Sequence, residues 1–175
     1  MSAQPRWPVV IGTIGLVLGA LSIIDKLDDL MTLWWTAEDW EQIFAPAVAD
    51  LIVRSVPPVG WRVVSVLVEL VLAALLVFAS LGLRRRSPGS VPRLRLWAWL
   101  AVAWAVVAVG LGGWWLQQRG GLSSVTGVEH WQGYAVFGLA VAGVLLIAFP
   151  VFVLAWLARP DVRAEFERWS RGTVP

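Results

Sequence analysis

The chain has 175 residues, of which 58% are apolar and only 15% charged, and its formal net charge is +2. In soluble domains charged residues supply about a quarter of the chain, so this composition excludes an ordinary soluble protein and indicates a bilayer protein. The absence of cysteine excludes disulfides, thiolate metal sites and a cysteine nucleophile.

Four apolar segments have the length of a membrane-spanning helix, which needs about 20 residues to cross about 30 Å of hydrocarbon. We predict an all-α fold in which one domain forms a four-transmembrane-helix bundle. The predicted spans are residues 7–24, 61–83, 97–116 and 133–157. The segments between and after them are an outer loop 25–60 with amphipathic helices, a cytoplasmic arginine loop 84–96, an outer loop 117–132, and a cytoplasmic tail 158–175 with a short helix.

The first span carries small residues at spacings of three and four, namely Gly12, Gly15, Gly19 and Ser22. Such a face lets another helix approach closely. Pro8 suits the first turn of a helix, and we expect the helix to continue past Asp25 into water. A cleaved signal peptide is the alternative, since Arg6 precedes an apolar core that reaches Gly19 and Ala20. A discarded peptide would not need a packing face.

The opening stretch RWPVVIGTIGLVLGAL resembles the start of small four-helix bacterial membrane proteins that carry no assigned function. The likeness covers this stretch alone, and it brings no catalytic or binding residue with it. A single lysine among many arginines, with abundant Ala, Val, Leu and Gly, is typical of a GC-rich bacterial genome. We therefore expect a multi-pass protein of a bacterial inner membrane.

The outer loop 25–60 contains apolar residues that recur at three and four, while acidic residues occupy the other face. Thr36, followed by Asp39, predicts a helix N-cap with an acid in the first turn, and Pro57-Pro58 ends the run. We expect two short outer helices, whose apolar face caps the bundle, lies on the outer leaflet or docks a partner. The candidate residues for this surface are Trp34, Trp35, Trp40 and Phe44.

The second span places one carboxylate, Glu69, inside the run WRVVSVLVELVLAALLVFASLGLRRR. At about 1.5 Å per residue from Trp61, it lies roughly 12 Å deep, close to the bilayer centre. We expect it to face protein or water, because a carboxylate in lipid is costly. No lysine, arginine or histidine falls within the predicted spans at that depth. The candidate members of this polar site are therefore Glu69, Ser65, Arg62, Trp104 and Ser22.

We predict that Glu69 is protonated and donates a hydrogen bond to a neighbouring helix, because burial without a cation disfavours the charged form of a carboxyl group. The alternative interpretation is a proton or cation site, since ionisable residues inside membranes are often functional. A single acid makes an incomplete proton pathway, so the structural interpretation is favoured.

The third span offers a second face of small residues, which are Ala101, Ala105, Ala108 and Gly112. We expect this face to pack closely against a helix of the same chain or of another copy. Trp104 lies near the middle of the span. Its indole N–H therefore needs an acceptor on a neighbouring helix.

The chain is rich in tryptophan, with 13 residues. Eight of them fall at the predicted boundaries, with Trp7, Trp97, Trp99 and Trp156 on the inner side and Trp61, Trp114, Trp115 and Trp131 on the outer side. An amphipathic indole is stable at these depths, so we predict aromatic belts. An aromatic cage or pigment pocket is the alternative.

The basic residues define an orientation. Most of the 14 lysines and arginines lie in the segments at one side, namely Arg6, Arg84, Arg85, Arg86, Arg93, Arg95, Arg159, Arg163, Arg168 and Arg171. The positive-inside rule therefore places both termini in the cytoplasm. In the tail, Val162, Phe166 and Trp169 share one face and predict a short interfacial helix.

The sequence lacks the motifs of common catalytic sites, including HExxH, GxSxG and a phosphate-binding loop. The only histidine, His130, follows Glu129, and Thr126 with Glu129 fits a capping box at the start of the fourth span. We expect no enzymatic activity, no cofactor and no metal. Nucleic-acid binding is disfavoured, because membrane topology already accounts for the arginines.

These patterns favour an accessory or scaffold subunit that packs with or organises a larger membrane complex. Its expected partners are the lipid bilayer, other membrane-protein subunits or further copies of the chain. The alternative is a small transporter or proton-coupled channel that uses Glu69.

Overall fold

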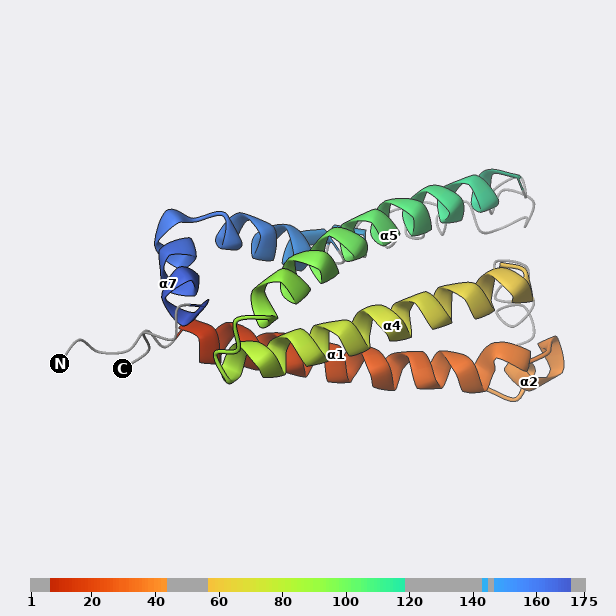
Figure 1. Ribbon diagram of the computed structural model, residues 1–175. Helices are drawn as coiled ribbons and strands as arrows, with labels where there is room; N and C mark the ends of the chain where they lie inside the picture. The colour runs from red at the N-terminus through yellow and green to blue at the C-terminus, as the bar shows by residue number, and fades with distance from the viewer. Residues whose placement is uncertain (1–6, 44–56, 119–142, 145–146, 171–175) are drawn as a thin grey trace.

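The computed structural model describes residues 7–43, 57–118, 143–144 and 147–170, which are helical and contain no strand. The elements are α1 (Trp7–Met31), η1 (Thr32–Trp34), α2 (Ala37–Glu41), α4 (Val59–Arg84), α5 (Ser90–Gln118), the helix Ile147–Leu157 and α7 (Pro160–Ser170). Figure 1 shows α7 lying across the ends of the longer helices, beside the start of α1. This is called the amino-terminal end below, and the end near α2 is called the opposite end.

Three helices of the described chain are long and apolar enough to cross a membrane: Trp7–Trp34, Val59–Arg84 and Ser90–Trp115. The first continues past Asp25, as expected. Of the predicted fourth span, 133–157, the described part is helical at 143–144 and 147–157, and the rest lies outside the described residues. The four-helix bundle therefore stays a prediction.

The predicted arginine loop 84–96 is wrong in its extent. Helix α4 ends at Arg84 and α5 begins at Ser90 rather than at Trp97. Pro92 is compatible with this, because a proline in the first turn of a helix removes no intrahelical hydrogen bond. The short connection reverses through Arg86, whose φ of 54° lies in the left-handed region. Its backbone N–H donates to the carbonyl of Leu83 over 3.0 Å.

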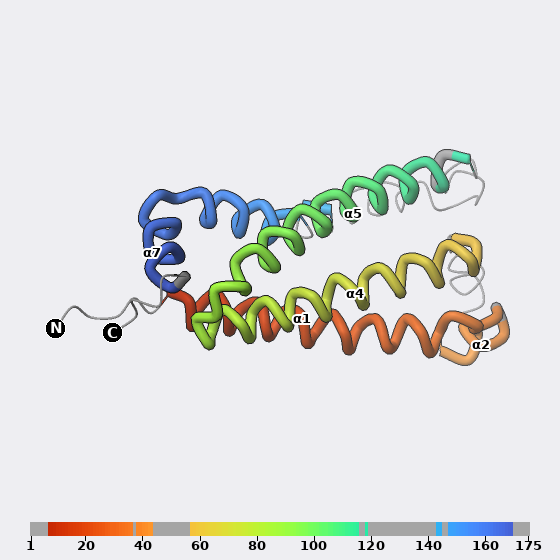
Figure 2. The backbone as a smooth tube through the Cα atoms, in the orientation of Figure 1, coloured from red at the N-terminus to blue at the C-terminus, as the bar shows by residue number. Residues whose placement is uncertain are grey.

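Helices α1 and α4 run side by side in close contact (Figure 2). The small residues of the first span, Gly12, Gly15 and Gly19, are buried in this contact. A Cβ atom added at Gly12 would lie 2.9 Å from the backbone carbonyl oxygen of Ser80. One added at Gly19 would lie 3.2 Å from the carbonyl oxygen of Ala73. Any larger residue would push the helices apart, so the glycines set their separation.

The hydrophobic core lies at the amino-terminal end, where the face of α7 that carries Val162, Phe166 and Trp169 folds onto the longer helices. Trp7 contacts Trp156 edge to face, with ring centroids 4.5 Å apart, and stacks on Trp169 at 5.7 Å. The indole N–H of Trp7 also donates to Glu165 over 2.9 Å. The predicted tail helix is confirmed, but its apolar face covers protein.

The aromatic-belt prediction fails for Trp7, Trp97 and Trp156, which belong to this core because α7 covers the helix ends. Trp99 and Trp114 are exposed, as a belt requires. Trp131 lies outside the described residues.

At the opposite end the chain turns through η1 and α2. Thr36 is the N-cap of α2, which confirms the predicted helix start. Its backbone N–H donates to Asp39 over 2.7 Å and thereby holds the pKa of that carboxyl group below its usual value. Trp35 and Trp40 meet edge to face at 4.9 Å, and Trp34 is exposed. Phe44 lies outside the described residues.

Candidate functional site

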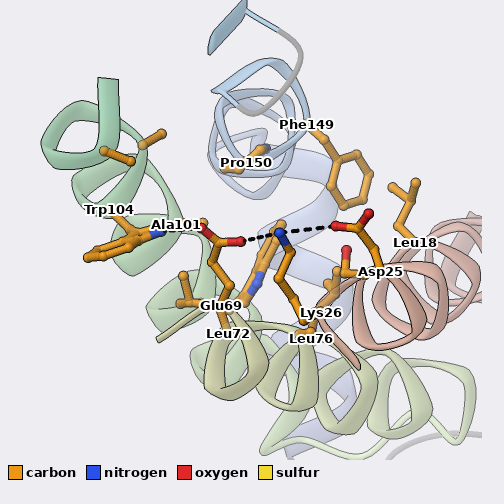
Figure 3. Close-up of a pocket in the computed structure, with 15 residues that line it drawn as sticks. Leu18, Asp25, Lys26, Glu69, Leu72, Leu76, Ala101, Trp104, Phe149 and Pro150 are labelled. Carbon is orange, nitrogen blue, oxygen red and sulfur yellow. Dashed lines mark hydrogen bonds and ion pairs between the residues drawn. The ribbon is translucent and has the colours of Figure 1, made fainter. Parts of the chain in front are cut away.

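Lys26 of α1 forms the centre of a charged cluster between two helices (Figure 3). Its Nζ atom lies 2.9 Å from Glu69 Oε2 on α4, 3.0 Å from Asp25 Oδ2 and 2.5 Å from Asp29 Oδ2. The side chains of Lys26 and Glu69 are only 19% and 30% exposed. The cluster therefore joins α1 to α4 by a largely buried ion pair.

This cluster corrects the prediction for Glu69. Because α1 stays helical past Asp25, it carries Lys26 alongside α4 and gives the acid the cation that the predicted spans lacked. An ammonium group and an indole N–H can only donate hydrogen bonds. Both oxygens of Glu69 therefore act as acceptors, and the predicted role as a hydrogen-bond donor is wrong.

Trp104 of α5 supplies the second partner of Glu69. Its indole N–H donates to Glu69 Oε1 over 3.2 Å, which confirms the predicted acceptor on a neighbouring helix. The Trp104 ring also stacks on Trp61, with centroids 5.7 Å apart and an interplanar angle of 24°. Glu69 is thus the point at which α1, α4 and α5 are joined by polar contacts.

Two predicted members of the polar site lie elsewhere. Arg62 donates to the carbonyl oxygens of Leu33 and Thr32 over 2.8 and 3.0 Å. Ser65 donates to the carbonyl of Arg62, one turn back in its own helix. The guanidinium group therefore satisfies the carbonyls at the end of the first span, where a cation also complements the helix dipole.

A cavity of about 400 Å³ opens beside the ion pair, between α1, α4, α5 and the helix Ile147–Leu157. Its polar edge is formed by Ser22, Asp25, Lys26 and Glu69, and its other walls are aliphatic or aromatic. Figure 3 shows the Lys26 ammonium between Glu69 and Asp25, with Trp104, Phe149 and Pro150 around it. Ser22, a predicted member of the polar site, also lines this cavity. In the described structure no hydrogen bond joins it to Glu69.

The small face of the third span forms one wall of the cavity. Ala105 is buried, and Ala101 and Ala108 line the same space. A Cβ added at Gly112 would have no described atom within 4 Å. The small side chains of Ala101, Ala105 and Ala108 leave room for the cavity between α5 and α4.

Sequence reasoning missed Lys26, Asp25 and Asp29 as members of the site. The sequence did contain one signal, because Lys26 and Asp29 are three residues apart. If the helix continues through them, their opposite charges lie on one face. The register between α1 and α4 was needed to bring Lys26 to Glu69.

Comparison of the chain with protein-family models, with curated proteins and with solved structures finds no match. Among the described residues, no group of His, Cys, Asp and Glu could hold a metal ion. The cavity offers an ammonium group, carboxylates, a hydroxyl group and an indole N–H. Such groups can form ion pairs and hydrogen bonds, either with a charged ligand or between helices.

Proposed function

We propose that the chain is a small integral membrane protein that serves as an accessory or scaffold subunit. It packs with a larger membrane complex, or with further copies of itself, in the lipid bilayer. The observation that carries this proposal is the pair of contacts that Glu69 makes with two other helices. Its carboxylate contacts Lys26 of α1 and Trp104 of α5 at once. A buried charge fixed by partners on two other helices sets helix positions and is poorly suited to carry protons.

Exposed apolar side chains at the opposite end support the same role. Met31 and Trp34 are 76% and 72% exposed, and Leu27 and Leu30 on α1 are exposed beside them. Large apolar patches of this kind mark contacts with lipid or with another protein. A partner subunit that covers the patch would remove this surface from water or lipid.

Mild detergent extraction followed by size-exclusion chromatography tests the proposal. The tagged chain should elute as a defined oligomer or with partner subunits in fixed ratio. Trp34→Ala should weaken this association. Trp99→Ala is the matched control, because Trp99 is also exposed, at 61%, but lies on α5. A single monodisperse monomer, unchanged by either variant, would contradict a scaffold role.

A small transporter or proton-coupled channel is the second candidate, favoured by the cavity that Glu69 and Lys26 share. Transport through it requires Glu69 to exchange its partners during a cycle. Purified protein in liposomes should then pass protons, and Glu69→Gln should abolish the flux. Equal flux from the variant and the natural chain would remove this candidate.

A further inference from the structure

The cavity beside Lys26 has the features of a binding site for a small amphiphile. Its volume of about 400 Å³ falls in the range of small-molecule sites, and most of its wall is apolar with a few convergent polar groups. We propose that it binds an organic cationic group, an ammonium or phosphonium, that is attached to an apolar body. Two sources share this chemistry, a free lipophilic cation and a lipid with an ammonium headgroup. The site does not depend on the scaffold role.

The charge balance selects a cation. The carboxylates of Asp25 and Glu69 both line the cavity, whereas Lys26 supplies the one ammonium group among its lining residues, so acidic groups outnumber basic ones at its polar edge. Lys26 engages Oδ2 of Asp25 and Oε2 of Glu69, and an ionised carboxylate has about four acceptor sites. A second cation at the cavity edge is therefore attracted by more negative charge than Lys26 opposes.

The walls select an apolar body. Trp97, Trp104 and Phe149 bring aromatic rings to the cavity, and aromatic faces attract organic cations. Leu72 and Leu76 add aliphatic surface from α4. The alanines of α5 provide the room, because longer side chains at Ala101 or Ala105 would occupy the same volume.

Other ligand classes fit less well. An anionic headgroup would have to compete for Lys26, which three carboxylates already hold. A bare metal ion would leave the aromatic and aliphatic walls uncovered, and the described residues offer no metal-binding group.

Equilibrium dialysis of the purified protein in dodecyl maltoside, with tetraphenylphosphonium as the probe and empty micelles as the blank, tests the free-cation source. Native mass spectrometry after addition of phosphatidylethanolamine or phosphatidylglycerol with the same acyl chains tests the lipid source. We expect saturable binding of one probe cation per chain, or retention of phosphatidylethanolamine in preference to phosphatidylglycerol. If neither occurs above the blank, the proposal is wrong.

Two matched pairs of variants locate the site. Asp25→Asn should weaken binding of the cation by about tenfold or more, because one charged partner is lost. Asp28→Asn makes the same charge change on α1 outside the cavity and should have a much smaller effect. Ala101→Leu should block binding, whereas Ala103→Leu, on an exposed position of α5, should not.

Circular dichroism establishes that each variant keeps its helices. Equal effects within each folded pair would place the bound cation elsewhere and overturn the proposal. Asp25→Asn leaves the contact between Lys26 and Glu69 in place, so its effect on binding is separable from loss of the fold.

Discussion

Lys26 is the residue on which the polar contacts between α1 and α4 depend. Its contacts with Asp25 and Asp29 stay within α1, and those two carboxylates are 68% and 46% exposed. Its contact with Glu69 crosses between helices and is the more buried of the three. Water screens the two partners on α1, whereas Glu69 depends on Lys26 for a counter-charge.

Substitution of Lys26 and substitution of Glu69 should therefore have unequal effects on the free energy of unfolding. Lys26→Met leaves the largely buried Glu69 carboxylate without a cation and should lower the free energy of unfolding by about 3 kcal/mol. Glu69→Gln keeps an acceptor for Trp104 and leaves Lys26 with two carboxylates, so it should cost about 1 kcal/mol. Unfolding in mixed micelles, followed by circular dichroism against SDS mole fraction, measures both.

Asp28→Asn serves as the control for this comparison, because Asp28 lies on α1 but is not among the described carboxylates that contact Lys26. If Glu69→Gln were less stable than Lys26→Met, the contacts of the Glu69 carboxylate would matter more for stability than the counter-charge that Lys26 gives it.

The chemistry of Glu69 was only partly predictable from the sequence. Its need for a polar partner and the need of Trp104 for an acceptor both follow from burial, and the two needs meet in one hydrogen bond. The identity of the cation did not follow, because Lys26 was assigned to an outer loop. Helical spacing shows which residues share a face of one helix, but it does not fix the register between two helices.

At the scale of helices, the contact between α1 and α4 rests on glycine. Gly12 approaches the backbone of α4 at Ser80, and backbone atoms cannot rotate away as a side chain can. Gly110 of α5 differs, since a Cβ added there would meet no described atom within 4 Å. The two positions therefore respond differently to one methyl group.

Gly12→Ala should lower the free energy of unfolding by about 1–3 kcal/mol, because the added methyl group overpacks the contact. Gly110→Ala should raise it by up to about 1 kcal/mol, since alanine is the better helix former. Both are measured by the same SDS titration. Equal destabilisation by the two variants would mean that close approach at Gly12 is not what holds α1 to α4.

The helices themselves were largely predictable, and their ends were not. Runs of apolar residues identify the three long helices, and Thr36 with Asp39 identifies the start of α2. The start of α5 was misplaced because the arginines were taken as a boundary, whereas α5 begins before Arg93. The positions of Trp97 and Trp156 depend on α7 folding back, which no local pattern determines.

At the scale of the whole molecule, the long helices alternate in direction, so the start of α1, the connection between α4 and α5, and α7 share one end (Figure 1). That end also holds the arginines at 84–86, 93 and 95. From the positive-inside rule we predict that this end faces the cytoplasm and that α2 lies on the outer side.

Labelling of single cysteines tests this orientation, and the natural chain contains no cysteine that would give background. Pro88→Cys lies at an exposed position of the connection between α4 and α5, and Glu38→Cys lies at an exposed position of α2. In intact cells a membrane-impermeant maleimide should label Glu38→Cys and leave Pro88→Cys unlabelled. Both should react once the membrane is opened, which is the control for intrinsic reactivity. If only Pro88→Cys were labelled in intact cells, the topology would be the inverse of the predicted one. The arginine cluster would then lie outside, against the electrostatic bias of membrane insertion.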